Sequence, residues 1–332
     1  MRWGPPAAVT AGLLALVAGC GSSDSEPWIV YQWGAPCAQG APGRGLCLTR
    51  PDGSDAHAIL TDVPGGVKDP DWSPDGTTLA FVVVGADGVG RIWTSAADGS
   101  GAKQALETTA RCPAEARSPA WSPDGKRLAF GCFHPDPEPI ELAIADLETG
   151  DVTTVWTSGR LEQAWSPRWS PDGSSLVFEL EQLSADREHT TGTGLAIVPS
   201  AGGAARRITP VSMFATYSDW SPDGERIVFS TYGIDSFETG GPGATNLYTV
   251  KPDGTELRPV TRYAEGGVRA GHPSWTPDGE RIIFTRITNS EKTGDGSPFD
   301  GYGQRRIAFV DPDGSDLQVI EGLWSTHPRL QP

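Results

Sequence analysis

Hydrophobic and polar residues alternate along the chain in short runs, and one pattern of such runs recurs five times. Each copy has a Trp, a Ser/Thr-Pro-Asp-Gly turn and a hydrophobic triplet that ends in Phe, as in Trp72-Ser73-Pro74-Asp75-Gly76 followed by Leu79-Ala80-Phe81. The other copies start at Trp121, Trp169, Trp220 and Trp275, so the spacings are 49, 48, 51 and 55 residues. Alternation with a period of two predicts strands with one buried face, and Pro-Asp-Gly predicts the turn between them.

A second series of hydrophobic runs lies between these copies. Its six members begin at Leu46, Ile92, Leu142, Leu195, Leu247 and Ile307, and most contain an Asp-Gly or Gly-Gly turn. Two hairpins in about 50 residues predict one four-stranded antiparallel sheet per repeat. Such a sheet cannot bury both of its faces alone, so the repeats are expected to pack on one another.

The two ends of the chain supply the missing copy of the first series. Residues 28–31 match the strand after the turn, and residues 327–330 match the strand before it, with Leu330 in the place of Trp. We therefore predict an all-β, six-bladed propeller of four-stranded antiparallel blades over residues 28–332. A C-terminal strand joins the N-terminal blade and closes the ring, which leaves no large sheet edge exposed.

Composition supports a β protein and excludes one class of partner. The 332 residues include 42 Gly and 29 Pro, which disfavour long helices. The net charge is −16, and such a chain would repel a phosphate backbone, so we expect no nucleic-acid partner.

The N-terminal segment predicts export and lipid attachment. Residues 1–19 have one basic residue, Arg2, and an apolar stretch too short for an ordinary membrane-spanning helix. The sequence Val17-Ala18-Gly19-Cys20 resembles a bacterial lipobox. The resemblance implies a cleaved signal peptide (1–19), a lipid on Cys20 that binds the membrane, and a tether (20–27). The protein would be held on the outer side of the bacterial cell membrane, in the cell envelope.

Four further cysteines predict disulfides in an exported chain. They are Cys37, Cys47, Cys112 and Cys132. Three pairings are open, and we favour the two local ones, Cys37–Cys47 and Cys112–Cys132. No Cys-x-x-Cys spacing occurs, which disfavours a metal site built from these thiols.

The repeat Pro-x-Trp-Ser-Pro-Asp-Gly-x-x-Leu-x-Phe resembles the TolB-type, or PD40 (WD40-like), β-propeller repeat over about residues 28–330. The resemblance implies a six-bladed propeller and an envelope protein. The repeat residues themselves have structural interpretations. Each repeat Asp is expected to cap its own turn, and each repeat Trp to pack between blades.

Function on a propeller resides in its loops and inner strands. The predicted binding face carries the long second-to-third loops, at 34–45, 132–140, 181–194, 231–246 and 287–306. Residues just before each Pro-x-Trp and two positions later face the channel mouth on that side. The candidate ligand-binding residues among them are Asp69, Asp71, Arg168, Tyr217, Asp219, His272, His327 and Arg329. The alternative is a solvated channel with ordinary ion pairs.

We predict a monomeric, non-catalytic binding or scaffold module for an envelope protein or a small polar ligand, with no cofactor. No Gly-x-Ser-x-Gly, His-Glu-x-x-His or Walker motif is present. The alternative is an enzyme with a metal-assisted site at the mouth, since oligogalacturonate lyases resemble this repeat and carry a His-rich metal site. His272, His327 and Asp69 are the residues available for such a site.

Overall fold

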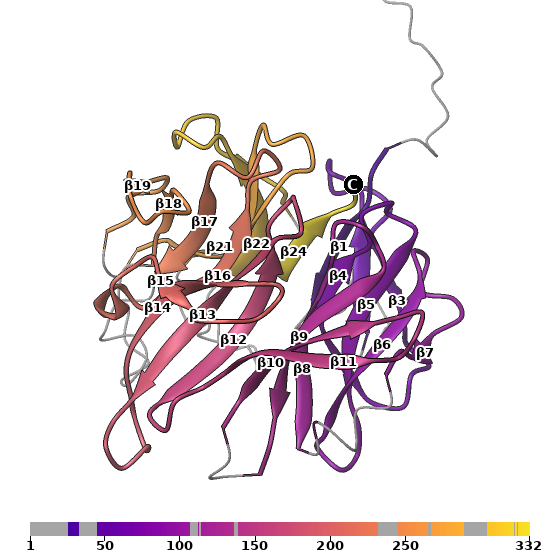
Figure 1. The fold of residues 1–332 in the computed structure, drawn as a ribbon. Helices are drawn as coiled ribbons and strands as arrows, with labels where there is room; N and C mark the ends of the chain where they lie inside the picture. The colour runs from indigo at the N-terminus through magenta and orange to yellow at the C-terminus, as the bar shows by residue number, and fades with distance from the viewer. Residues whose placement is uncertain are drawn as a thin grey trace, which may run out of the picture.

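The fold is a closed ring of six four-stranded antiparallel sheets, as predicted (Figure 1). The structure is a computed structural model, and it describes residues 26–32, 45–106, 112, 114–135, 139–231, 245–264, 267–288, 304–321, 323 and 325–332. Cys20, the signal segment and most of the tether lie outside these residues. The long second-to-third loops at 34–45, 231–246 and 287–306 lie almost wholly outside them too.

Each blade is a meander that starts with its inner strand. Blade 1 contains β24 (Thr326–Leu330), β1 (Ile29–Gln32), β2 (Leu46–Thr49) and β3 (His57–Ile59). Blade 2 contains β4 (Gly66–Trp72), β5 (Thr78–Val84), β6 (Gly90–Ala96) and β7 (Lys103–Gln104). Blade 3 contains β8 (Glu115–Trp121), β9 (Arg127–Phe133), β10 (Glu141–Asp146) and β11 (Val152–Thr157). Blade 4 contains β12 (Glu162–Trp169), β13 (Ser175–Leu183), β14 (Thr190–Pro199) and β15 (Arg206–Arg207). Blade 5 contains β16 (Ala215–Trp220), β17 (Ile227–Thr231), β18 (Leu247–Val250) and β19 (Arg258–Pro259). Blade 6 contains β20 (Arg269–Trp275), β21 (Ile282–Thr288), β22 (Gln304–Val310) and β23 (Gln318–Val319). A single turn of 3₁₀ helix, Val211–Met213, precedes β16.

The ring closes through the C-terminal strand. β24 pairs antiparallel with β1, with Leu330 opposite Ile29, and the two strands lie side by side in Figure 1. Gln331 extends the closure because its backbone N–H donates to the Trp28 carbonyl over 2.7 Å and its side chain accepts from Trp28 N. The predicted closure is therefore confirmed.

The five repeat turns share one hydrogen-bond pattern. In each, the Ser or Thr hydroxyl donates to the Asp two residues later over 2.5–2.6 Å. The glycine that follows has φ of 66–72°, which an L side chain adopts only with strain. These bonds lower the pKa of each Asp, as at Asp75, where the Ser73 hydroxyl is the largest cause. The repeat Asp residues thus cap their own turns, as predicted.

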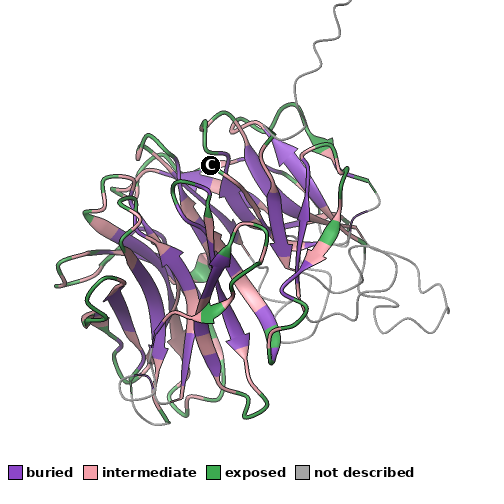
Figure 2. Cartoon of the chain, turned by 90° about the vertical axis from the view of Figure 1, so that its right-hand side faces the viewer, coloured by how far each residue is buried: buried purple, intermediate pink, exposed green. Residues whose placement is uncertain are grey.

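The core is divided among the blade interfaces rather than gathered at one centre. Six clusters of buried apolar residues are present, and each combines side chains of two neighbouring blades. In the cluster between blades 1 and 2, for example, Leu46 and Leu48 pack with Trp72 and Phe81. Figure 2 shows the result, with buried residues running through the middle of each sheet and exposed residues at the turns.

The repeat Trp residues pack between blades, as predicted, and one of them is less buried than the others. Trp72, Trp169, Trp220 and Trp275 are 6–9% exposed. The Trp169 indole N–H donates to the Ala120 carbonyl of the preceding blade over 3.1 Å, and Trp72 donates to the Arg329 carbonyl in the same way. Trp121 is only half-buried, at the edge of the cluster between blades 2 and 3.

Two features differ from the sequence prediction. The outermost strands β7, β15, β19 and β23 have two residues each. Four strands with their loops in a repeat of about 50 residues predict about five or six residues per strand. These strands face solvent on one side, so they have little apolar surface to bury. The segment 181–194 is mostly not a loop, because β13 and β14 continue their pairing to Gln182–Gly192 and Leu183–Thr190.

One of the two predicted disulfides is confirmed. Cys112 and Cys132 form a disulfide. Cys47 is also disulfide-bonded, and Cys37 lies outside the described residues. No helix in the described part of the chain is long and apolar enough to cross a membrane.

The two Trp environments predict unequal losses of stability. Trp169→Ala removes a buried indole and should lower the free energy of unfolding by about 3–5 kcal/mol. Trp121→Ala should cost clearly less, because that ring already contacts solvent. Urea unfolding of both variants measures the difference, and equal losses would contradict the assignment of Trp169 to the interface core.

Removal of residues 326–332 should open the ring. Without β24, the edge of β1 and the apolar faces of blades 1 and 6 become exposed, so we expect aggregation and a lower melting temperature. A chain that ends after Gln331 keeps β24 and the hydrogen bonds between Gln331 and Trp28, and it serves as the control in size-exclusion chromatography and thermal melts. A soluble monomer with the wild-type melting temperature would exclude this closure.

Candidate functional site

One backbone feature recurs on all six inner strands and forms the channel mouth. Each inner strand has a non-glycine residue with φ of 49–55°, in the left-handed region. The six are Asp69, Ser118, Ser166, Tyr217, His272 and His327. At each of them the pairing with the second strand shifts, so that Lys68 faces Val82 while Asp71 faces Ala80. This is a β-bulge, which turns a side chain away from its regular direction.

The bulges surround a cavity of 390 Å³ at the mouth. Six of the predicted site residues line it: Asp69, Arg168, Tyr217, His272, His327 and Arg329. Asp71 and Asp219 lie on the turn side of the channel instead, with Arg168, around a smaller cavity of 180 Å³. All eight predicted residues therefore face the channel, at two levels.

An aromatic group forms one side of the mouth. The His272 and His327 rings lie 3.7 Å apart between centroids, and Tyr217 lies 4.1 Å from His272 and 5.2 Å from His327. Burial lowers the pKa of His272 to about 3 and that of His327 well below its usual value, and nearby Arg329 adds to both effects. Both imidazoles are thus uncharged at neutral pH.

Below the mouth, two carboxylates and two guanidiniums form an ion-pair belt, which we define as Asp71, Arg168, Asp219 and Arg329. Arg329 lies 3.2 Å from Asp219 and 4.0 Å from Asp71. Each aspartate also accepts a backbone N–H of the next blade, from Trp121 and from Trp275, over 2.9 and 3.0 Å. Burial raises the pKa of Asp71 and lowers that of Arg168, while their mutual attraction opposes both shifts.

Glu179 is the most buried acid of the mouth, and the sequence analysis missed it. It lies on β13 and is 6% exposed, and its carboxylate accepts the Tyr217 backbone N–H over 2.8 Å. Desolvation raises its pKa to about 7. A signal was available, because Glu179 follows the repeat Phe of the third copy, where the other copies have Val82, Gly131, Ser230 and Thr285.

The opposite side of the mouth carries two cationic side chains, and a buried carboxylate balances part of their charge. Lys68 and Arg117 both pair with the buried Glu115, and the Lys68–Glu115 distance is 3.3 Å. The Arg117 guanidinium lies 5.4 Å from the Trp165 ring centroid, and the Trp165 indole N–H donates to Glu181 over 2.6 Å. The mouth thus offers aromatic rings, two amine or guanidinium donors and carboxylates within one cavity.

The residues suggested for a metal at the mouth do not gather closely enough. Among the described residues, one group of three His, Cys, Asp or Glu side chains has its ligand atoms within 4.8 Å of one another, and it is Cys132, His134 and Glu141 in blade 3. The His272 and His327 rings contact each other in a tilted arrangement, whereas Asp69 lies near Ser118, whose hydroxyl is 3.5 Å from its carboxylate. The described His and Asp side chains suggested as metal ligands at the mouth therefore do not form a compact coordinating group.

Comparison with solved structures places the same fold in several proteins. TolB from Acinetobacter baumannii superimposes with a TM-score of 0.64 at 18% identity, over 92% of this chain and 67% of that one. A putative TolB from Agrobacterium tumefaciens gives 0.55 at 19% identity, over 76% and 95%. An oligogalacturonate lyase in complex with manganese gives 0.53 at 18% identity, over 86% and 70%. At these identities the likeness concerns the fold alone.

Sequence comparison gives a narrower result. An uncharacterized protein of Agrobacterium fabrum, Atu1656, is 28% identical over 149 residues, which cover 43% of this chain and 42% of the relative. The alignment thus spans less than half of that relative. The model of the TolB beta propeller domain, PD40, matches residues 94–295. Because this match covers more than half of the chain, the protein belongs to the TolB β-propeller domain family.

Proposed function

We propose that the protein is a non-catalytic binding module whose channel mouth receives a polar group of an envelope protein or a small polar ligand. One observation carries this proposal: six inner strands turn a side chain into the same open cavity of 390 Å³. A left-handed backbone at a non-glycine residue is unfavourable, and such strain concentrates at functional positions. The six bulges together direct side chains into the cavity at the mouth.

The chemistry of the mouth supports a polar occupant with an exposed flat or apolar part. The clustered Tyr217, His272 and His327 rings offer a surface for such a part, as uncharged aromatic faces do. Lys68 and Arg117 offer donors, and Glu179 offers a carboxyl that can be neutral or charged near pH 7. In the belt below the mouth, Arg329 pairs with both aspartates and Arg168 donates to backbone carbonyls, so the belt forms a floor and leaves binding to the groups above.

An enzyme is the alternative function, and the mouth gives it less support. One structural relative of this fold is an oligogalacturonate lyase in complex with manganese. In this chain, the two imidazoles at the mouth contact each other, and the carboxylate of Asp69, the acid of the predicted set, lies near the Ser118 hydroxyl. Side-chain recognition fits these contacts better than coordination of a catalytic metal.

We place this module in the bacterial cell envelope, anchored by a lipid on Cys20. The support comes from the lipobox-like sequence, from the disulfide Cys112–Cys132, which is typical of exported proteins, and from membership in the TolB propeller family. A monomer is sufficient for this role, because the mouth is formed within one ring.

Photo-cross-linking tests which face meets the partner. A photoreactive amino acid in place of Lys68, at the mouth, should give discrete adducts in cells of the source bacterium, identified by mass spectrometry. The same replacement of Lys126, an exposed lysine on a repeat turn at the opposite face, is the matched control and should give none. Adducts from position 126 alone, or equal adducts from both positions, would contradict the proposal.

The buried Glu179 predicts a pH dependence of stability. Because its folded pKa of about 7 exceeds its unfolded value, the folded state holds the proton more tightly. Its contribution is complete below the unfolded pKa and is lost as pH rises through about 7. Glu179→Gln should therefore gain stability relative to wild type as pH rises from 4.5 to 8, by about 3 kcal/mol in total.

Urea unfolding at several pH values measures this difference. Glu188→Gln, an exposed position on the same blade, is the control and should follow the wild-type curve. If the difference between Glu179→Gln and wild type is the same at pH 5 and pH 8, the raised pKa of Glu179 is wrong.

A further inference from the structure

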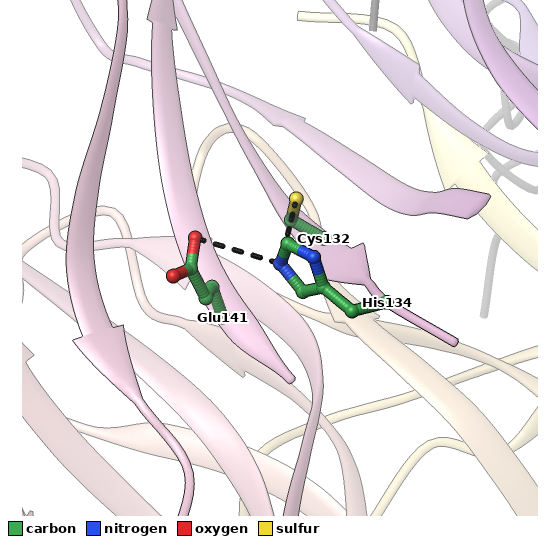
Figure 3. Close-up of side chains that lie close together, drawn as sticks. All are labelled: Cys132, His134 and Glu141. Carbon is green, nitrogen blue, oxygen red and sulfur yellow. Dashed lines mark hydrogen bonds and ion pairs between the residues drawn. The ribbon is translucent and has the colours of Figure 1, made fainter. Parts of the chain in front are cut away.

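A second group of chemically active side chains lies in blade 3, away from the aromatic group of the mouth. Cys132 lies near the end of β9, His134 directly follows that strand, and Glu141 opens β10 directly opposite Cys132 in the sheet register (Figure 3). Cys132 is bonded to Cys112, which lies just before β8. The proposed function uses none of these four residues.

The distances within the group suit a metal ion. His134 Nε2 lies 3.8 Å from Cys132 Sγ and 3.8 Å from the Glu141 carboxylate, and all three ligand atoms lie within 4.8 Å of one another. With Zn–S near 2.3 Å and Zn–N near 2.0 Å, a tetrahedral zinc site needs ligand atoms separated by roughly 3.5 Å. The atoms are therefore close to coordinating distances already.

A neighbouring side chain holds one of the possible metal ligands in place. The Thr154 hydroxyl donates to Glu141 Oε2 over 2.8 Å, which fixes the carboxylate in the way that outer-shell partners fix metal ligands. Cys132 and Cys112 are 0% and 2% exposed, while the His134 and Glu141 side chains are 16% and 22% exposed. A metal could reach the group from the side of His134 and Glu141.

The disulfide decides how many ligands are present. While Cys112 and Cys132 are bonded, neither sulfur is a thiolate, and only one imidazole and one carboxylate remain. We propose that reduction of this disulfide creates a zinc site from Cys112, Cys132, His134 and Glu141, so that the disulfide and the metal are alternative states of the same sulfur atoms. Two thiolates, one imidazole and one carboxylate form a four-coordinate set of the type that zinc accepts.

The exchange balances with a dithiol as reductant. The disulfide takes up two electrons and two protons and becomes two thiols, while the dithiol loses them and becomes a disulfide. Zinc then binds both sulfurs as thiolates and displaces their two protons to solvent. In the reverse direction, an oxidant of the disulfide class takes two electrons from the thiolates, the Cys112–Cys132 bond forms again, and zinc leaves.

Cobalt(II) titration tests the proposal, because tetrahedral cobalt bound to thiolate has characteristic absorption bands. We use the chain with Cys20→Ser, either oxidised or reduced with a phosphine that is then removed without air. The reduced protein should bind one equivalent with thiolate-to-cobalt charge transfer, zinc should displace it, and the oxidised protein should show no such band. His134→Ala and Glu141→Gln should each weaken binding at least about tenfold.

Matched variants separate this site from the other thiols and histidines. Cys47→Ser and His57→Ala, both in blade 1, should leave the titration unchanged, whereas Cys132→Ser should abolish the charge-transfer band. If reduction loosens blade 3, added zinc should restore the β-sheet circular dichroism and raise the melting temperature of wild type and His57→Ala, but not of His134→Ala. Absence of cobalt binding by the reduced protein, or equal affinity in His134→Ala, would overturn the proposal.

Discussion

The structure depends on one constraint: each four-stranded sheet has two apolar faces and can cover them only with its two neighbours. The six buried clusters are all shared between adjacent blades, so no blade has a complete core of its own. An open row of six sheets would leave one apolar face bare at each end. The pairing of β24 with β1 removes both bare faces together, so that every sheet of the closed ring is covered on both faces.

The channel follows from this ring, and its polar lining needs compensation. Inner strands approach the axis with side chains that water reaches poorly, so the charges there must be paired. Arg329 faces both Asp71 and Asp219, and these aspartates also accept backbone N–H groups of the next blade. The belt thus links neighbouring blades as well as balancing charge. Above it, the bulged residues line the cavity at the mouth.

The sequence was sufficient for the architecture because the repeat has strong local signals. The Trp-Ser/Thr-Pro-Asp-Gly motif fixes a turn, the following triplet fixes a buried strand, and the six copies of the second series of hydrophobic runs fix the number of blades. The channel positions of His272 and Arg329 also followed from the repeat. The left-handed bulges did not, since a residue such as Tyr217 shows no propensity for that backbone. Glu179 was missed because strand periodicity marks its position as core, and the short outer strands because their length depends on exposure.

The strand β24 has two roles that are joined in one segment. It completes blade 1, and it carries His327 into the aromatic group and Arg329 into the belt. During synthesis these residues follow every other strand, so a nascent chain with five finished blades still has an incomplete mouth. The complete mouth therefore exists only in the closed ring, and any molecule that required it would discriminate a fully assembled ring from a partly assembled one without contacting any other surface.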